Sequence, residues 1–293
     1  MSAARVHLLD GTYELFRAYF AVPSRRSPDG LEVGAVGGLL ASILALLRDP
    51  EVTHLAAAFD HVIESFRNDL FAGYKTSDGV PDDLMAQFPL AEEALRALGV
   101  VVWPMIEFEA DDALATAAHR FASQVEQVVI LSPDKDLAQC VVGSRVVIRD
   151  RLRSVTYDEE AVRQKFGVLP ASIPDLLALV GDRADGVPGL PGWGKKSAAA
   201  LLSSYGRIDA IPEDPSGWPG SLRNRDRLAQ TLRERRTDAS LYRILTTLRT
   251  DAPLAEALQD LCWRGAPRGP FLAFCERYGL RDLADRPSRW RDV

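Results

Sequence analysis

Apolar runs alternate with stretches of helical periodicity along the first half of the chain. Five runs are typical of buried strands, because each is short, almost entirely apolar and followed by turn residues. They cover residues 5–9, 54–59, 100–103, 127–131 and 145–148. Helical periodicity predicts helices over residues 11–19, 36–47 and 82–98. Strands that alternate with helices indicate an α/β fold, with a mainly parallel sheet covered by helices on both faces.

The pattern changes after about Asp158, where the rest of the chain is expected to be wholly helical. Helices are expected from Lys195 onward, twice between Trp218 and Arg249, and over residues 271–278. We find no internal repeat and no low-complexity tract. The change of pattern predicts two parts, residues 1–157 and residues 158–293.

The composition indicates the class of protein and the cellular compartment. A chain of 293 residues that is 47% apolar and 26% charged is ordinary for a soluble globular protein. Cys140, Cys262 and Cys275 are odd in number and widely spaced, which predicts neither disulfides nor a zinc site and favours the reducing cytoplasm. Asp10 interrupts the N-terminal apolar run too early for a signal peptide. No run approaches the roughly 18 apolar residues of a membrane span.

Charge is distributed unevenly along the chain. The net charge of −6 argues against a protein that coats nucleic acid, but bound metal ions would offset acidic residues and permit a local contact. Residues 223–236 are strongly basic, whereas the acidic motifs lie N-terminal to them. The Walker phosphate loop, the GxSxG motif and Cys/His clusters are absent from the sequence. Because these motifs are absent, the carboxylates are the candidate groups for catalysis or metal binding.

Carboxylates follow four of the predicted strands. They are Asp10, Asp60, the group Glu109, Asp111 and Asp112, and the pair Asp134 and Asp136. A single Asp after a strand is commonly a turn or cap residue, and acids at a helix start commonly form a first turn open to water. Open α/β sheets, however, place their ligands at the carboxyl ends of strands, and Mg²⁺ prefers clustered carboxylate oxygens. The repetition predicts a divalent metal site, which Asp182 and Asp185 should also face.

Two other segments suit nucleic acid. Residues 65–83 mix aromatic and basic side chains ahead of a polar loop. This is typical either of an amphipathic helix with a solvated loop or of a segment that meets phosphates and stacks on a base. Residues 181–206 place glycines and prolines directly before a helical run that begins with Lys195 and Lys196. Because such a turn presents free N–H groups to a phosphate, a helix–turn–helix contact with a nucleic-acid backbone is favoured over a plain helix–helix connection.

Six blocks of the sequence together resemble the 5′ nuclease family of 5′–3′ exonucleases and flap endonucleases. This family includes the N-terminal nuclease domain of bacterial DNA polymerase I and free-standing bacterial relatives. The blocks stand in the family's order: LLDGTYELFRAYF, AFDHVIESFRNDLFAGYK, FEADDALA, LSPDKDLAQ, GDRADGVPGLPGWGKKSA and LRTDAPL. The resemblance implies a PIN-like α/β/α fold for residues 1–157, with a gateway segment at 65–98. It implies a helical region for residues 158–293, with a helix–three-turn–helix motif at 181–206.

The resemblance also implies site residues and cofactors. Two or more Mg²⁺ or Mn²⁺ ions would be bound by Asp10, Asp60, Glu109, Asp111, Asp112, Asp134, Asp136, Asp182 and Asp185. One ion would centre on Asp10, Asp60, Glu109 and Asp111, a second on Asp134, Asp136 and Asp185, with Asp112 and Asp182 binding directly or through water. The gateway that handles the scissile phosphate matches Arg67, Tyr74 and Lys75. A DNA clamp, which in relatives also holds a monovalent cation such as K⁺, matches Gly189, Gly192, Gly194, Lys195 and Lys196.

The sequence departs from the family pattern at three places. Gly186 follows Asp185 where the family commonly has Asn, and Trp193 stands where the family has Ile. The stretch TSDGVPDD follows Lys75 without the Arg or the apolar, proline-containing stretch that relatives often carry. The chain also ends near residue 293 without a polymerase portion, so a free-standing nuclease or an isolated domain is expected.

The expected activity is hydrolysis of phosphodiesters at 5′ ends and flaps of DNA in replication and repair, by a monomer. Two metal ions would activate the attacking water and stabilise the leaving oxygen, so no protein base is required. Lys75 and Arg67 would neutralise charge on the phosphate, and duplex contacts would follow structure rather than sequence. Two alternatives are a PIN-type ribonuclease, which would lack residues 181–206, and a catalytically silent DNA-binding protein, which would lack the carboxylates.

Overall fold

The computed structural model describes residues 4–220 and 222–292, which fold into two compact units. The first unit comprises Met1–Ile63, Ser77–Ser132 and Thr250–Val293, so far as these ranges are described. The second unit comprises Glu64–Thr76 and Pro133–Arg249, of which Ser221 is not described. Each unit is therefore built from segments that are distant in the sequence. The predicted boundary between residues 157 and 158 lies inside the second unit, and a division at that point stays a prediction.

A parallel sheet forms the centre of the first unit. Its strands are β1 (Arg5–Asp10), β2 (His54–Asp60), β3 (Val101–Met105) and β4 (Gln127–Leu131), in the order β3-β2-β1-β4. Asp10 of β1 pairs with Ala58 of β2, and Leu9 pairs with Leu131 of β4. All four strands lie where the apolar runs predicted them, and most of their residues are buried. This register brings the carboxyl ends of β1, β2 and β4 to one edge of the sheet.

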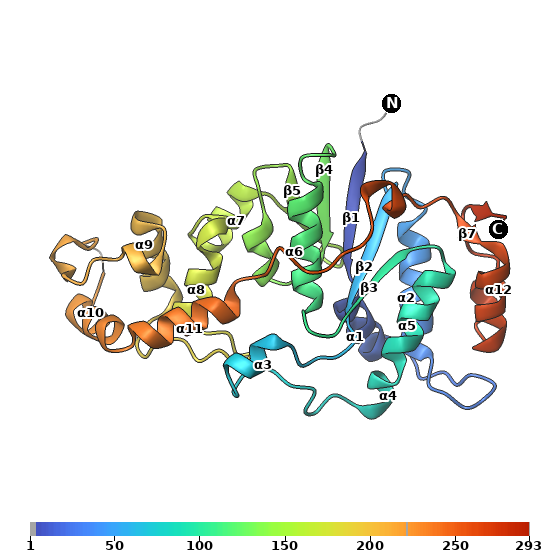
Figure 1. Cartoon of the computed structure of the whole chain (residues 1–293), viewed down its shortest axis with the longest axis horizontal. Coiled ribbons are helices and arrows are strands. Elements are labelled where there is room, and N and C mark those ends of the chain that lie inside the picture. Colours follow the sequence, from blue (N-terminus) through green and yellow to red (C-terminus); the bar gives the residue numbers. More distant parts are fainter. Residues whose placement is uncertain (1–3, 221, 293) are drawn as a thin grey trace. The chain divides into compact units, whose positions relative to one another are not determined.

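Helices cover both faces of this sheet. They are α1 (Gly11–Ala21), α2 (Gly34–Leu46), α4 (Asp82–Met85), α5 (Gln87–Ala97) and α6 (Ala110–Phe121). In Figure 1, α6 lies on one side of the strands and α1, α2 and α5 lie on the other. The single helix predicted over residues 82–98 is broken at Ala86, because Pro89 has no N–H to donate to the Met85 carbonyl. The α/β fold with a parallel, doubly covered sheet is confirmed.

The end of the first unit is not wholly helical, contrary to the prediction for residues after 158. It contains η5 (Leu258–Leu261), β7 (Ala266–Pro267), α12 (Arg268–Arg277), η6 (Arg281–Leu283) and β8 (Trp290–Arg291). β7 and β8 pair in parallel. They were missed because two-residue strands have no periodicity to detect.

The second unit is mainly helical. Its strands are β5 (Val146–Asp150) and β6 (Val155–Tyr157), which pair antiparallel. Its helices are α3 (Phe66–Leu70), η1 (Asp136–Cys140), α7 (Glu159–Phe166), η2 (Pro170–Ser172), α8 (Ile173–Val180), α9 (Lys195–Tyr205), η3 (Ile208–Ala210), η4 (Pro215–Gly217), α10 (Arg225–Glu234) and α11 (Arg236–Thr246). The two helices predicted between Trp218 and Arg249 are confirmed as α10 and α11. None of the helices in the described ranges is long and apolar enough to cross a membrane.

Candidate metal centre

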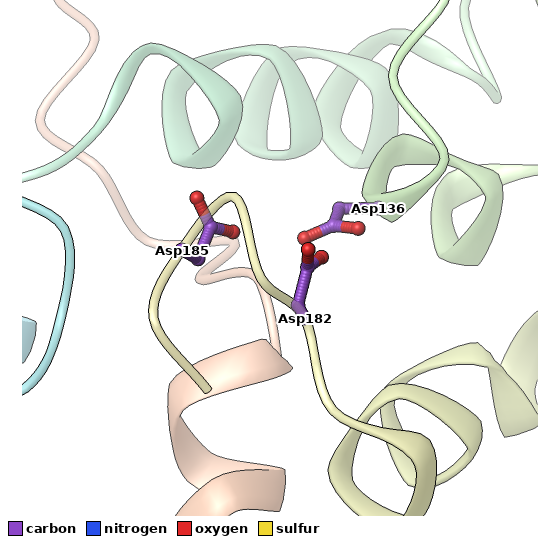
Figure 2. A group of neighbouring side chains, drawn as sticks. All are labelled: Asp136, Asp182 and Asp185. Carbon is purple, nitrogen blue, oxygen red and sulfur yellow. The ribbon is translucent and has the colours of Figure 1, made fainter. Parts of the chain in front are cut away.

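Three carboxylates of the second unit gather around one point. Each of Asp136, Asp182 and Asp185 places one carboxylate oxygen within 4.8 Å of the others, and Figure 2 shows the three groups turned toward a common space. Asp136 begins η1 just after a short loop. Asp182 and Asp185 lie on the loop after α8, which is closed by two backbone hydrogen bonds of 2.8 and 2.7 Å between Asp182 and Val187. Two different segments thus bring carboxylates close enough together to bind one shared cation.

The environment of Asp136 suits an oxygen-ligated metal ion. Its side chain is buried, and its Oδ1 atom has no hydrogen-bond partner within residues 4–220 and 222–292. Burial, and next the charge of Asp134, raises the pKa of Asp136 well above its ordinary value. Asp134 is held close, because its Oδ1 accepts the backbone N–H of Asp136 at 2.8 Å. A buried carboxylate with an unsatisfied oxygen, next to further acids, is the donor set that a hard divalent cation stabilises.

Two lysines contact this cluster. The ammonium group of Lys135 donates to Asp182 and lies 3.4 Å from Oδ1 of Asp136. The Nζ atom of Lys75 lies 3.3 Å from Oδ1 of Asp185. Burial alone would lower the pKa of Lys135, but the charges of Asp136 and Asp182 outweigh it and raise that pKa above its ordinary value. The sequence predicted a substrate role for Lys75 and did not single out Lys135, which lies between two predicted ligands.

Close backbone contact holds Lys75 beside Asp185. The Lys75 N–H donates to the Asp185 carbonyl at 3.1 Å. Gly186 has φ +73°, and a Cβ atom built there would lie 2.1 Å from the Gly73 carbonyl oxygen. A side chain at position 186 would therefore force the two segments apart. This contact accounts for glycine at a position where the family commonly carries Asn.

Arg67 and Tyr74 are buried supports of the same segment. The Arg67 side chain is fully buried, and its Nε and Nη2 atoms donate to the carbonyls of Leu245 and Thr247 at 2.8 and 3.1 Å. Tyr74 is 4% exposed and packs in a small apolar cluster with Val187 and Leu245. The burial of both side chains argues against direct contact with a phosphate, and the predicted contact stays untested. Both residues fix the segment that carries Lys75.

In the first unit, two predicted ligands end neighbouring strands. Asp10 ends β1, where its carboxylate accepts the Tyr13 N–H and the Ser132 hydroxyl, each at 2.8 Å. Asp60 ends β2, where its Oδ1 accepts the Ala110 N–H at 2.8 Å. Because Ala110 is the first residue of α6, Asp60 lies against the helix end that carries the Glu109–Asp112 motif. β1 and β2 pair in parallel, so the sheet brings both carboxylates to the same edge.

The start of α6 is not the solvated acidic turn considered from the sequence. Glu109 precedes the helix and is buried, and Asp112 is 0% exposed. The Oδ2 atom of Asp112 accepts the Glu109 N–H at 3.0 Å, which makes Asp112 a cap of the helix end. Asp111 is partly exposed. The alternative of a first turn open to water is therefore wrong for Glu109 and Asp112, since both are withdrawn from solvent.

The predicted clamp is a loop between two helices of the second unit. α8 ends at Val180 and α9 begins at Lys195. Gly189 and Gly192 have positive φ, whereas Gly194 is extended and precedes the first turn of α9. Lys195 and Lys196 are exposed in that first turn, which no side chain of residues 4–220 and 222–292 caps. The first-turn N–H groups and both ammonium groups remain open to an anion.

Trp193, the departure from the family's Ile, is accommodated inside this unit. Its side chain is 6% exposed, and its ring packs edge-on against Trp218, with ring centroids 6.2 Å apart. Trp218 is anchored by a hydrogen bond of 3.0 Å from its indole N–H to the Pro212 carbonyl. The large aromatic residue therefore fills the core below the clamp, and its partner is another tryptophan from a later loop.

A groove of about 640 Å³ adjoins the clamp. It is lined by Gly192, Lys196, Ser197, Ala200, Leu222, Arg223, Asn224 and Leu228. Among these lining residues the charged ones are Lys196 and Arg223, and both are cationic and exposed. Arg223 was not named as a site residue from the sequence, although it opens the basic stretch 223–236. The groove extends the positively charged surface from α9 to the start of α10.

Comparison with known proteins defines the family. Residues 5–167 match the family model "5′-3′ exonuclease, N-terminal resolvase-like domain", and residues 168–268 match "5′-3′ exonuclease, C-terminal SAM fold". The chain therefore belongs to the 5′-3′ exonuclease family of hydrolases. The resemblance inferred from the six sequence blocks is confirmed.

Two relatives illustrate the range of the family. The DNA polymerase I of Bacillus caldotenax is 33% identical over 284 residues, which cover 95% of this chain and 32% of the polymerase. The chain thus spans about a third of the length of such relatives. The 5′-3′ exonuclease of Aquifex aeolicus (strain VF5) is 33% identical over 258 residues, which cover 87% of this chain and 86% of that protein.

Solved structures share the fold. The T5 5′-exonuclease with bound zinc ions aligns with a TM-score of 0.69 at 18% identity, over 84% of this chain and 90% of that one. The catalytic core of Rad2 in complex with DNA substrate aligns with a TM-score of 0.61 at 15% identity, over 94% of this chain and 87% of that one. At such low identity these likenesses show the fold alone.

Proposed function

We propose that this protein is a divalent-metal-dependent, structure-specific 5′ nuclease that hydrolyses phosphodiesters at the 5′ ends and flaps of DNA. The observation that carries the proposal is the cluster of Asp136, Asp182 and Asp185 in a member of the 5′-3′ exonuclease family. The T5 relative was solved with divalent metal ions, which supports a metal at such carboxylates. The Rad2 relative was solved with DNA, which supports DNA as the ligand.

The carboxylates of the two units would hold the metal ions. In the first unit they are Asp10, Asp60, Glu109 and Asp111, with Asp112 in a supporting position. In the second unit they are Asp134, Asp136, Asp182 and Asp185. Bound Mg²⁺ or Mn²⁺ would supply an activated water and stabilise charge on the phosphate oxygens. Because metal-bound water needs no separate base, the scattered histidines require no catalytic role.

Lys75 is the protein's own candidate for contact with the reacting phosphate. Its ammonium group lies beside Asp185, at the margin of the carboxylate cluster, and its side chain is partly exposed. A fixed positive charge at that position would stabilise the charge that develops on a phosphate oxygen. Arg67 and Tyr74 would act by holding the Lys75 segment in place, because both are buried in the same unit.

Duplex DNA would be bound by the clamp and the groove. The first turn of α9 offers N–H groups, Lys195 and Lys196, and Arg223 continues the cationic surface. Such contacts reach phosphates and carry no base information, so recognition would follow DNA structure. A K⁺ ion at Gly189, Gly192 and Gly194, a monomeric state and a cytoplasmic location all stay predictions.

The test is cleavage of a 5′-labelled flap duplex in Mg²⁺ or Mn²⁺, beside an RNA hairpin. We expect metal-dependent cleavage near the flap junction and little cleavage of RNA. The double variant Asp134→Ala/Asp136→Ala should lose cleavage but retain flap binding in Ca²⁺. Near-normal turnover by this variant would overturn the metal assignment, and preferential cleavage of the hairpin would favour a PIN-type ribonuclease. Flap binding without any cleavage by the wild-type chain would favour a DNA-binding protein.

A further inference from the structure

Lys135 lies inside the acidic cluster but is not one of the predicted site residues. Its ammonium group donates to Asp182 and lies 3.4 Å from Oδ1 of Asp136. Both carboxylates are buried, whereas the Lys135 side chain is 38% exposed. The charge of Asp134 adds to the attraction and helps to raise the pKa of Lys135. The lysine therefore reaches into the cluster from its solvent side and is held there by charge.

The oxygen atoms that hold Lys135 are also the atoms best placed for a metal ion. Oδ1 of Asp136 is buried without a hydrogen-bond partner among the described residues, and it faces the ammonium group. Asp182 supplies its other carboxylate oxygen, Oδ1, to the Ala184 N–H at 3.1 Å, which leaves Oδ2 for the lysine. A divalent ion and an ammonium group would compete for contact with the same carboxylate oxygens, since like charges repel strongly in a buried site.

We propose that Lys135 is an internal counter-cation that competes with a divalent metal ion for Asp136 and Asp182, so that metal loading displaces its ammonium group from the cluster. This inference rests on the proposed metal site. Lys135 is a positioning residue here, because it keeps the carboxylates together when their charge is not matched by metal. The partial exposure and the long flexible stem of the side chain allow it to swing outward without unfolding η1.

Two linked results are expected of Lys135→Met, which keeps the length of the side chain and removes its charge. Metal should bind more tightly, because no ammonium group has to leave. The metal-depleted protein should unfold at a lower temperature, because Asp136 and Asp182 then lose the ammonium group that offsets their mutual repulsion. A lysine that merely supported the metal ligands would produce the opposite first result, namely weaker metal binding.

The experiment is a Mn²⁺ titration of the full chain after EDTA treatment and dialysis, followed by calorimetry and by thermal unfolding. We expect the Mn²⁺ midpoint of Lys135→Met to fall about tenfold or more, in keeping with removal of one unit charge at contact distance. Lys135→Arg, which keeps the charge, should stay near the wild-type midpoint. The matched control is Lys165→Met, which removes an exposed lysine that lies over the Tyr157 ring in the same unit.

Each outcome bears on a different part of the inference. An unchanged or raised Mn²⁺ midpoint in Lys135→Met overturns the competition, while cleavage by the wild-type chain would leave the proposed function intact. A wild-type chain that shows no Mn²⁺ binding overturns the metal site and the competition together. If Lys135→Met fails to fold, Lys135→Gln in the same titration decides, because its amide can still donate to one carboxylate without carrying charge.

Discussion

The two sets of carboxylates are held in place in different ways. In the first unit, Asp10 and Asp60 accept backbone N–H groups from the residues at the starts of α1 and α6. In the second unit, Asp134 and Asp182 also accept backbone N–H groups, but the charge of the cluster is met by two lysines. The first set is thus held at strand ends and helix starts, whereas the second combines backbone N–H groups with two lysine ammonium groups.

This difference bears on how each set responds to its environment. Backbone donors at a helix start keep their positions as long as the helix and the sheet are folded, so the first set is preorganised. Lysine side chains can move away, so the second set can exchange its counter-charge for a metal ion. We infer that the carboxylates of the first unit keep fixed positions and that those of the second unit change their counter-charge when metal binds.

The largest expected effects come from removing one carboxylate of each set. Asp60→Ala and Asp136→Ala should each lower flap cleavage by about a thousandfold or more, roughly 4 kcal/mol of transition-state stabilisation. In EDTA, the changes in stability relative to the wild-type chain should differ between the two variants. Asp60→Ala leaves the buried Ala110 N–H without its acceptor and should lose about 1–3 kcal/mol. Asp136→Ala removes a buried charge from an acidic cluster and should keep or raise the unfolding temperature.

Thermal unfolding by circular dichroism in EDTA checks this pair, with single-turnover cleavage measured on the same preparations. The comparison fails if Asp136→Ala is destabilised as much as Asp60→Ala, since the second set would then be as firmly built as the first. If both variants lose cleavage equally but differ in stability, both carboxylates are needed for the reaction, whereas Asp60 alone also stabilises the fold.

Lys75→Ala should give the next largest effect. We expect kcat to fall about a hundredfold while the Kd for a flap in Ca²⁺ changes by less than about threefold, because the charge acts on the reacting phosphate. Lys165→Ala, an exposed lysine of the same unit, serves as the control and should leave both values unchanged. A fall in affinity as large as the fall in turnover would place Lys75 in binding and would weaken the view that the second set serves the reaction step.

The surroundings of Lys135 and Arg67 show how much of the structure could be predicted from the sequence. The run of residues 127–131 marks β4 at its observed ends, and Asp134 and Asp136 follow it as predicted. The role of Lys135 could not be read, because a lysine between two acids looks the same whether it faces solvent or its neighbours. The burial of Arg67 depends on carbonyls about 180 residues later in the chain, which local patterns do not reveal.

Glycine gives a second example of this limit. Gly186 appears in the sequence only as a departure from the family pattern. The structure explains it by a contact with Gly73, more than a hundred residues earlier. Periodicity shows which residues form strands and helices, but it does not show which loops come within contact distance. The acidic side chains of the candidate site could be predicted because each follows its own strand or motif, whereas Lys75 and the carbonyls that hold Arg67 come from other segments.

The clamp should show a smaller effect, confined to binding. Lys195→Ala/Lys196→Ala should weaken flap binding several-fold and reduce the salt slope of log K by about 0.9 for each phosphate that is no longer neutralised. Arg223→Ala should reduce the slope by about 0.9, the value for a single phosphate, because Arg223 lines the groove next to Lys196. Arg227→Ala is the control, since Arg227 is exposed on α10 but does not line the groove. A slope identical to that of the wild-type chain for every variant would place the duplex elsewhere.

The smallest expected change in stability concerns Asp112, whose side chain accepts the N–H of Glu109 at the start of α6. Asp112→Asn keeps an oxygen that can accept the Glu109 N–H, so its stability should stay near that of the wild-type chain. Asp112→Ala loses this acceptor in a buried position and should cost about 1–2 kcal/mol. If Asp112 supports the metal only from outside its contact shell, the conservative change Asp112→Asn should lower cleavage by about tenfold, the low end for such residues. A loss of cleavage as severe as that of Asp136→Ala would identify Asp112 as a direct metal ligand. The carboxylates of the first unit would then be held in place by metal as well as by backbone N–H groups.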